Sequence, residues 1–180
     1  MKWVAFFSQT GSEILNISKK LNRFPNQIIC NNNDIGKINA ELTENKPVFI
    51  TRNKPTIDEY YEHIGKDLSG NDILITLHGW LRILPKEVCE SYNNIWNLHP
   101  GLITQYPELK GKDPQERVVG KRETYPNIGI VIHKVVPEVD EGPVVLEKKI
   151  KNEFDSADQV YYNLHNIATD AWVEFLSEIF

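Results

Sequence analysis

Short apolar runs alternate with amphipathic segments along the first 100 residues. The apolar runs predict five strands, at residues 2–7, 27–30, 47–51, 72–77 and 95–98. Several of these runs are continuously apolar, which is typical of parallel strands covered on both faces. Between them, helical periodicity predicts helices at residues 12–21, 56–68 and 85–91. This alternation predicts an α/β fold with a doubly wound, mostly parallel sheet, whose ligand crevice lies at the carboxyl ends of the strands.

The pattern changes after residue 100. Prolines, glycines and mixed charges between 101 and 127 predict a segment that is mostly loop, with one short helix at 114–119. A connection of this length in a compact domain is usually a binding loop or a lid. The remaining chain predicts two strands joined by a turn around 138–142 and then an amphipathic helix, at 128–136, 143–150 and 158–175. With no linker or repeat, we expect residues 1–180 to form a single domain.

The composition is that of an ordinary folded protein. Hydrophobic residues make up 41% and charged residues 25% of the 180 positions, which is enough for one well-buried core. The formal net charge of −5 argues against a broad basic face for nucleic acid. The apolar run at 3–7 is too short for a signal-peptide core or a membrane span. Cys30 and Cys89 form no metal-binding or redox motif, so we expect both to be reduced, buried small hydrophobic residues in a cytoplasmic protein.

The segment Asn97-Leu98-His99-Pro100 carries the first candidate chemistry. Side chains alternate across a strand, so Asn97 and His99 share one face at the end of the fifth predicted strand. An amide N–H beside a titratable ring suits a reaction through a negatively charged tetrahedral intermediate, because one group stabilises the oxyanion and the other moves protons. Acyl transfer is therefore the first hypothesis. A polar pair at a strand end is also typical of a hydrogen-bonded turn with no catalytic role.

Three further segments, 77–85, 129–133 and 139–145, surround this pair. In this order the four segments resemble the family of formyltransferases that use 10-formyltetrahydrofolate. That family includes glycinamide ribonucleotide formyltransferase and the catalytic domains of methionyl-tRNA and sugar-amine formyltransferases. The resemblance runs from residue 1 to about residue 171. It implies a Rossmann-like formyltransferase fold and 10-formyltetrahydrofolate as the formyl donor.

The resemblance also implies a role for three catalytic residues. Asn97, matching the family's Asn, would donate a hydrogen bond to the formyl oxygen. His99, matching the family's His, would stabilise that oxygen as an imidazolium and take part in proton transfer. Asp140, matching the family's Asp, would hold the protonated ring and order a water, and a nearby carboxylate is expected to raise the pKa of the His99 imidazole. His133 occupies the family's second histidine position, so it either supports the site or is a partly buried histidine bonded to backbone.

By the same resemblance, the pterin of the folate would lie between two walls, held largely by backbone groups. A flat heteroaromatic needs apolar faces and in-plane donors and acceptors. Ordinary core packing is the alternative for Leu81, Ile83 and Leu84, and we expect it to hold for Ile83. The residues carried over to the walls are Trp80, Leu81, Arg82, Leu84, Val135, Glu138, Val139 and Asp140.

The acceptor side is less well matched. Gly11-Ser12 corresponds to the family's phosphate-binding turn, where N–H groups at a helix start attract an anion, and Ser12 is expected to cap that helix. Glu13 then places a negative charge where the family has Asn. The position of a Glu that contacts the substrate's amine region in the family falls on Ala168. The loop could hold a larger acceptor through its basic side chains, Lys110, Lys112 and Arg117.

Together these residues predict formyl transfer from 10-formyltetrahydrofolate to a primary amine of a small molecule, with a nucleotide-linked amino sugar as the leading acceptor. The alternatives are glycinamide ribonucleotide as the acceptor, hydrolysis of 10-formyltetrahydrofolate, and a folate- or nucleotide-binding module without turnover. No metal is expected. A zinc site built from His78, His99 and His133 is the alternative that three imidazoles leave open.

Overall fold

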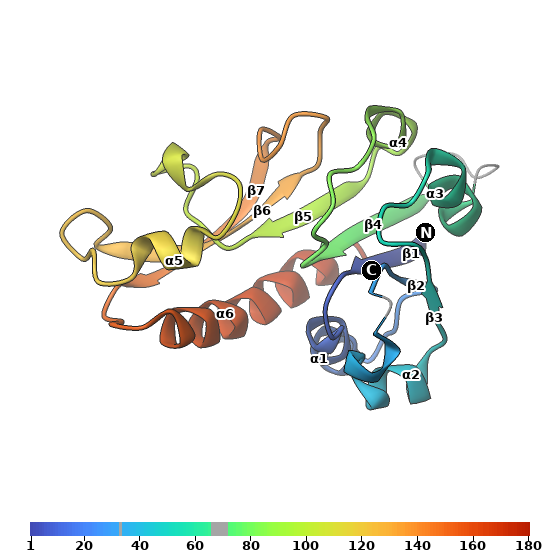
Figure 1. Cartoon of the computed structure of the whole chain (residues 1–180), viewed down its shortest axis with the longest axis horizontal. Helices are drawn as coiled ribbons and strands as arrows, with labels where there is room; N and C mark the ends of the chain where they lie inside the picture. The colour runs from blue at the N-terminus through green and yellow to red at the C-terminus, as the bar shows by residue number, and fades with distance from the viewer. Residues whose placement is uncertain (33, 66–71) are drawn as a thin grey trace. The chain divides into compact units, whose positions relative to one another are not determined.

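The structure is a computed structural model that describes residues 1–32, 34–65 and 72–180 (Figure 1). Its strands are hydrogen-bonded in the order β3-β2-β1-β4-β5-β6-β7. Pairing is parallel from β3 through β5, whereas β6 and β7 pair antiparallel. The strands are β1 (Lys2–Phe7), β2 (Gln27–Cys30), β3 (Val48–Ile50), β4 (Ile73–His78), β5 (Ile95–His99), β6 (Asn127–Lys134) and β7 (Val144–Lys151). The predicted α/β fold with a mostly parallel sheet is thereby confirmed.

Helices connect most of the strands. The α-helices are α1 (Ser12–Leu21), α2 (Ala40–Asn45), α3 (Ile57–Ile64), α4 (Lys86–Ser91), α5 (Pro114–Val118) and α6 (Ala157–Ser177), and the 3-10 helices are η1 (Ile35–Lys37) and η2 (Pro107–Leu109). The chain divides into two compact units. The first comprises residues 1–97 and 135–137, and the second comprises 98–134 and 138–180. Each is described in turn.

The first unit holds a parallel sheet that is covered on both faces. Neighbouring residues of β1 enter different apolar clusters: Val4 and Phe6 pack with side chains of α3 and α4, and Ala5 and Phe7 pack with side chains of α1 and α2. Because both faces of the strand are buried, β1 reads as a continuous apolar run rather than an alternating one. This confirms the helices on both faces that define a doubly wound arrangement.

The turn between β1 and α1 depends on Gly11. Its φ is 73°, in the left-handed region, and a Cβ there would lie 2.5 Å from Leu42 Cδ2. Gly11 is itself the N-cap residue, without a side-chain cap, so the expected cap at Ser12 is wrong. Ser12 is instead the first residue of α1, and its Oγ accepts a hydrogen bond from Asn39 Nδ2 at 3.3 Å. The predicted strand-to-helix turn at glycine is correct.

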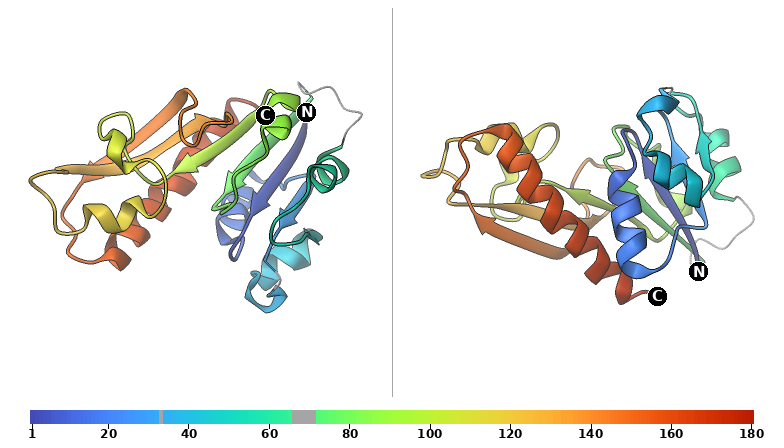
Figure 2. Two further views of the ribbon diagram at one scale, coloured as in Figure 1. Left: turned by 45° about the horizontal axis from the view of Figure 1, so that its top comes forward. Right: turned by 90° about the horizontal axis from the view of Figure 1, so that it is seen from below.

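The second unit holds the β6–β7 hairpin with α6 packed along it (Figure 2). The apolar stripe of α6, including Val160, Leu164 and Trp172, is buried. Ala168 belongs to this stripe and is buried, so it is a core residue of α6. A β-bulge interrupts the hairpin register between Ile132 and His133.

Several elements differ from the sequence-based expectation. α2 and the two 3-10 helices were not predicted, since α2 is short and buries only Leu42. α3 begins after Thr56, which forms a capping box with Glu59. The predicted helix at 56–68 extends beyond α3, and its residues 66–68 lie outside the described part of the chain. Both cysteines are free thiols, but only Cys30 is fully buried, whereas Cys89 is half-buried.

Candidate active site

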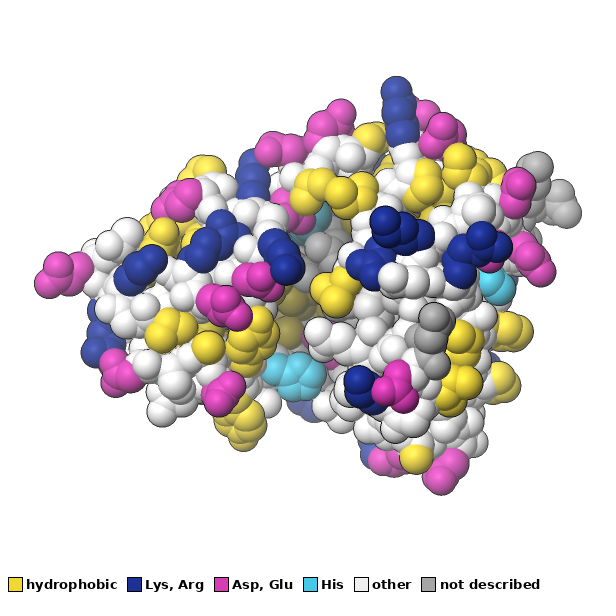
Figure 3. All heavy atoms as spheres, viewed as in Figure 1, with side chains coloured by type: hydrophobic (Ala, Val, Ile, Leu, Met, Phe, Trp, Pro, Cys, Tyr) yellow, Lys and Arg dark blue, Asp and Glu magenta, His cyan; other side chains and the backbone are white. Residues whose placement is uncertain are grey.

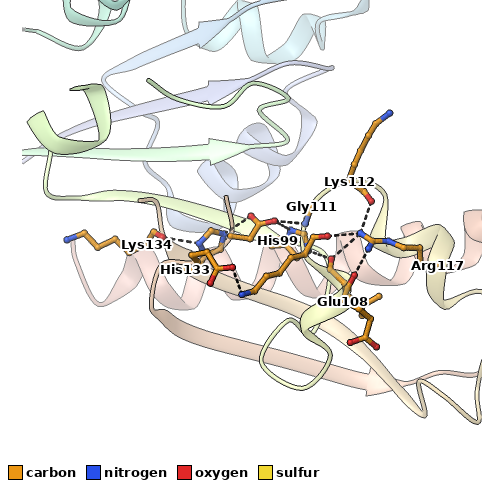
Figure 4. Close-up of polar contacts among 11 residues, drawn as sticks. His99, Glu108, Gly111, Lys112, Arg117, His133 and Lys134 are labelled. Carbon is orange, nitrogen blue, oxygen red and sulfur yellow. Dashed lines mark hydrogen bonds and ion pairs between the residues drawn. The ribbon is translucent and has the colours of Figure 1, made fainter. Parts of the chain in front are cut away.

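His99, the last residue of β5, lies at the carboxyl end of the strand with both ring nitrogens facing oxygen atoms (Figure 4). Nε2 is 2.9 Å from the carbonyl oxygen of Leu109, and Nδ1 is 3.3 Å from Asp140 Oδ2. A carbonyl oxygen can only accept, so Nε2 carries a proton and donates to Leu109. The ring is 4% exposed. In the neutral ring Nδ1 carries no proton and only faces Asp140, whereas in the imidazolium it donates to that carboxylate.

Asp140 lies in the turn between β6 and β7 with a left-handed φ of 56°. Its Oδ2 accepts the Gly111 N–H at 2.8 Å as well as facing His99, and its Oδ1 lies 3.5 Å from His133 Nε2. The turn is tight: a Cβ on Gly142 would lie 1.8 Å from the Lys134 carbonyl oxygen. The strained turn therefore aims one carboxylate at two histidines and an N–H group.

His133 is 2% exposed and follows the β6 bulge, a feature that re-aims side chains near functional sites. Its Nδ1 lies 3.0 Å from the Lys134 carbonyl oxygen and therefore donates to it. His133 therefore bonds to backbone, and it also faces Asp140.

Burial determines the direction in which the pKa of His99 shifts. Loss of solvent lowers the pKa of the His99 imidazole below its usual 6.5, although the Asp140 carboxylate and the Leu109 carbonyl act in the opposite direction. The expected increase in this pKa is therefore wrong, because burial outweighs the single carboxylate. Burial alone would raise the pKa of Asp140, but the His133 hydrogen bond, the charge of His99 and the Gly111 N–H together lower it. These two pKa directions favour an ionised Asp140 beside a neutral His99.

This titration predicts a pH-dependent stability. As the pH falls below about 6.5, the unfolded chain protonates His99 before the folded protein does, so the free energy of unfolding should decrease. The charged groups facing the ring are Asp140, His133 and Arg117. Urea denaturation between pH 8 and pH 5 measures this effect, and the loss should be smaller in His99→Asn than in the wild type. Equal losses in the two proteins would contradict the assignment.

Arg117 of α5 interacts with the loop beside His99 rather than with solvent. The guanidinium donates to four backbone carbonyl oxygens, those of Glu108, Leu109 at 3.2 Å, Lys110 at 3.0 Å and Lys112 at 2.7 Å (Figure 4). The sequence-based expectation that Arg117 could hold an acceptor therefore does not describe this structure, in which the cation binds the protein's own backbone. Lys110 pairs with Glu141 at 2.7 Å, whereas the Lys112 side chain is 91% exposed.

The other predicted residues fall into both units. Asn97 precedes His99 by two residues in β5, where it is half-buried and pairs in register with Leu77 of β4. Trp80, Leu84 and Val135 form part of one apolar cluster in the first unit. Leu81 and Ile83 are exposed, so the expected core packing of Ile83 is wrong. Glu138 and Val139 precede Asp140 in the turn and are exposed.

Glu13 makes a contact that the sequence did not predict. Its Oε2 lies 2.8 Å from Nδ1 of His78, whose side chain is fully buried. Nε2 of the same ring lies 2.8 Å from Thr76 Oγ1, which in turn accepts the Trp3 indole N–H at 2.8 Å. With Glu13 ionised, His78 Nδ1–H donates to it. A buried chain of hydrogen bonds therefore fixes the Glu13 carboxylate in the first turn of α1.

The first unit also contains a polar hollow of about 290 Å³ that sequence reasoning missed. Arg82 crosses it, donating to the Asn53 carbonyl at 2.9 Å and the Leu81 carbonyl at 2.8 Å. The sequence feature that could have predicted this hollow is the polar residues that directly follow β1 and β2, because ligands bind at the carboxyl ends of the strands in parallel sheets. The lining residues are Ser8, Asn31, Asn32, Asn53, Leu81 and Arg82.

The three-histidine metal site is not formed in the described part of the chain. His99 and His133 face Asp140, whereas His78 is bonded to Glu13 and Thr76. Across residues 1–32, 34–65 and 72–180, no group of three metal-binding side chains is arranged to hold an ion. In the same residues, no helix has the length and apolar character needed to cross a membrane.

A buried imidazole beside a carboxylate, at the carboxyl end of a strand in a mostly parallel sheet, suits an enzyme that moves protons during catalysis. The chain belongs to the formyl transferase family, whose sequence profile matches residues 1–176. A methionyl-tRNA formyltransferase of Thermotoga sp. (strain RQ2) is 29% identical over 129 residues, 71% of this chain and 38% of the relative. A phosphoribosylglycinamide formyltransferase of Dictyostelium discoideum is 41% identical over 85 residues, 43% of this chain and 40% of the relative.

Solved structures share the fold. A phosphoribosylglycinamide formyltransferase from Anaplasma phagocytophilum superposes with a TM-score of 0.81 at 23% identity, over 99% of this chain and 86% of that one. A formyltetrahydrofolate deformylase from Pseudomonas syringae superposes with a TM-score of 0.76 at 19% identity, over 97% of this chain and 60% of that one. The chain spans about two fifths of the length of the curated relatives described above.

Proposed function

We propose that this protein transfers a formyl group from 10-formyltetrahydrofolate to a primary amine of a small molecule, with a nucleotide-linked amino sugar as the leading acceptor. The observation that carries this proposal is the buried His99–Asp140 pair at the carboxyl end of β5, in a chain of the formyl transferase family. The reaction forms one C–N bond to the amine and breaks the C–N bond to N10 of the folate.

The pair supports proton transfer in this reaction. When the amine attacks the formyl carbon, the oxygen becomes negative and the nitrogen becomes positive. A neutral His99 takes up the proton that the amine loses, and the ionised Asp140 stabilises the resulting imidazolium. The imidazolium then gives this proton to N10 as the C–N10 bond breaks. Asn97 supplies an amide N–H for the developing oxyanion. Because Nε2 already donates to Leu109, a formyl oxygen accepts from that nitrogen only by sharing or replacing the Leu109 carbonyl.

The acceptor assignment rests on Glu13. The resemblance places a substrate phosphate at the turn of Gly11 and Ser12, where α1 begins. The structure fixes a carboxylate in this same first turn through His78, and a carboxylate repels a phosphate but accepts hydrogen bonds from sugar hydroxyls or an ammonium group. These contacts favour an amino sugar over glycinamide ribonucleotide.

Other acceptors are supported by single observations. The names of the Dictyostelium and Anaplasma relatives favour glycinamide ribonucleotide. The Thermotoga relative is named for methionyl-tRNA. Against a nucleic-acid acceptor, the net charge is −5, and basic and acidic side chains are interspersed on the face drawn in Figure 3. Hydrolysis of the donor, suggested by the name of the Pseudomonas neighbour, is the remaining alternative reaction.

A formyl-transfer screen tests the proposal. The protein is incubated with 10-formyltetrahydrofolate and a panel of nucleotide-linked amino sugars, free amino sugars and glycinamide ribonucleotide, with detection of the N-formyl product. Formylation of an amino sugar supports the full proposal. Formylation of the ribonucleotide alone would mean that glycinamide ribonucleotide, not an amino sugar, is the acceptor. Release of formate without an N-formyl product would mean that the reaction is hydrolysis of the donor.

Folate binding gives a separate prediction. A non-hydrolysable analogue of 10-formyltetrahydrofolate at about 100 times its Kd should stabilise the folded protein by about 2.7 kcal/mol and raise Tm by roughly 5–10 °C. Tryptophan fluorescence should change as well, since Trp80, which packs against Phe6 and Tyr60, belongs to the predicted pterin wall. p-Aminobenzoylglutamate, which lacks the pterin, is the matched control. No response to the analogue at saturation would exclude this donor.

A further inference from the structure

Arg117 binds residues 108–112 of the second unit, a loop that begins with the last two residues of η2. Its four acceptors are consecutive or nearly consecutive carbonyls of this loop, at Glu108, Leu109, Lys110 and Lys112. Arg117 itself lies in α5, which follows the loop directly. The guanidinium therefore fixes the path of the backbone immediately before its own helix.

The same loop supplies two groups to the candidate active site. The Leu109 carbonyl accepts from both Arg117 and His99 Nε2, so one oxygen joins the guanidinium to the catalytic ring. The Gly111 N–H donates to Asp140 Oδ2. Each member of the His99–Asp140 pair is thus bonded to backbone that Arg117 holds in place.

We propose that Arg117 is a positioning residue for formyl transfer: by binding the carbonyls of residues 108–112, it sets the ring orientation and tautomer of His99 and the direction of the Asp140 carboxylate. The kinetic consequence rests on the proposed function. The geometric consequence for His99 does not, because it concerns the ligand-free protein.

The loop needs such an attachment. Gly111 and Asp113 both have left-handed φ values, 82° and 53°; glycine adopts this region freely, but for Asp113 it is an uncommon conformation that the surrounding contacts must hold. Four of the five carbonyls from Glu108 to Lys112 converge on the planar guanidinium of Arg117 (Figure 4). A guanidinium offers five N–H donors in a rigid plane, whereas a lysine ammonium offers three on a flexible stem. We therefore expect Arg117→Lys to keep the charge but loosen the loop.

Imidazole NMR of the ligand-free protein tests the geometric part. In the wild type, neutral His99 should carry its proton on Nε2, as the Leu109 bond requires. In Arg117→Lys, a looser loop should mix the two tautomers and move the pKa of His99 up toward its ordinary value, because burial holds that pKa down and the charge of residue 117 is retained. Arg122→Lys is the matched control, since Arg122 bonds Glu153 and Asp155 outside the site.

Steady-state kinetics test the catalytic part. Arg117→Lys should lower kcat by about tenfold and Arg117→Ala by about 100-fold, with the KM for the folate changing less than about twofold, because misplacing a catalytic group acts mainly on turnover. Arg122→Ala should retain wild-type kcat. If Arg117→Ala fails to fold, as judged by circular dichroism and thermal unfolding, the kcat of Arg117→Lys alone tests the positioning role.

The outcomes separate this inference from the proposed function. A wild-type His99 tautomer together with wild-type kcat in both Arg117 variants overturns the positioning role. If the wild type formylates no amine but the variants alter the His99 tautomer, the positioning role stands and the proposed function fails.

Discussion

His99→Ala and Asp140→Ala should each lower the kcat of formyl transfer by about 10³-fold or more. His99 is the group that moves protons, and Asp140 is the charge that stabilises its protonated form, so loss of either removes interactions made mainly in the transition state. The KM for the folate should change much less. Quench-flow or steady-state assays with the best acceptor from the screen measure both constants.

Two controls make this result specific. His165→Ala removes an exposed histidine of α6 and should retain wild-type turnover. Asp140→Asn keeps the size of the side chain but removes its charge, so it should be nearly as inactive as Asp140→Ala if electrostatic stabilisation is the main role. Near-normal turnover in His99→Ala or Asp140→Ala would rule out the mechanism.

Asn97 belongs to the same prediction. Asn97→Ala should cost about 10²–10³ in kcat, the effect of losing one oxyanion donor. His99 should keep its Nε2–H tautomer in this variant, because that N–H still donates to the Leu109 carbonyl. A lowered kcat with an altered His99 tautomer would instead mean that Asn97 acts through the ring.

Much of the fold could be read from local sequence pattern. The observed bounds of β1, β2 and α1 coincide with the predicted ones, because each is a strongly periodic or continuous apolar segment with a clear boundary residue. α2 was missed because a six-residue helix that buries one leucine leaves no periodic signal. The η2 helix and α5 fall in a proline-rich loop, where only α5 was predicted, from its start at Pro114.

The residues of the candidate site could be predicted where strand alternation or a family motif identifies them. Their protonation and their bonding partners could not be predicted, because these depend on tertiary contacts. The structure places His99 and Asp140 together as expected. The pKa direction of His99 was wrong, because a sequence shows the neighbouring carboxylate but not the depth of burial. The roles of Arg117 and His78 were missed for a similar reason, because tertiary structure determines their partners. Arg117 of α5 binds backbone carbonyls that precede its own helix, and His78 at the end of β4 binds Glu13, which is 65 residues away in sequence.

Glu13→Asn should change acceptor preference. A carboxylate about 4 Å from a phosphate costs about 1 kcal/mol or more in free energy even in water, and more in a drier site. Its removal should raise kcat/KM for glycinamide ribonucleotide by about tenfold, since 1.4 kcal/mol corresponds to a factor of 10. The same change removes an acceptor of hydrogen bonds from sugar hydroxyls or an ammonium group, so kcat/KM for an amino sugar should fall about tenfold.

A second substitution separates charge from hydrogen bonding. Glu13→Gln removes the charge but keeps an oxygen that can accept the His78 Nδ1–H, so it should match Glu13→Asn for the ribonucleotide while leaving α1 in place. Glu41→Gln is the matched control, because it removes an exposed carboxylate from α2 that pairs with Lys19. The ratio of kcat/KM for the two acceptors should shift by about 100-fold in Glu13→Asn and stay unchanged in Glu41→Gln. Efficient use of glycinamide ribonucleotide by the wild type, with kcat/KM above about 10⁴ M⁻¹s⁻¹ and no better amine in the screen, would overturn the acceptor assignment.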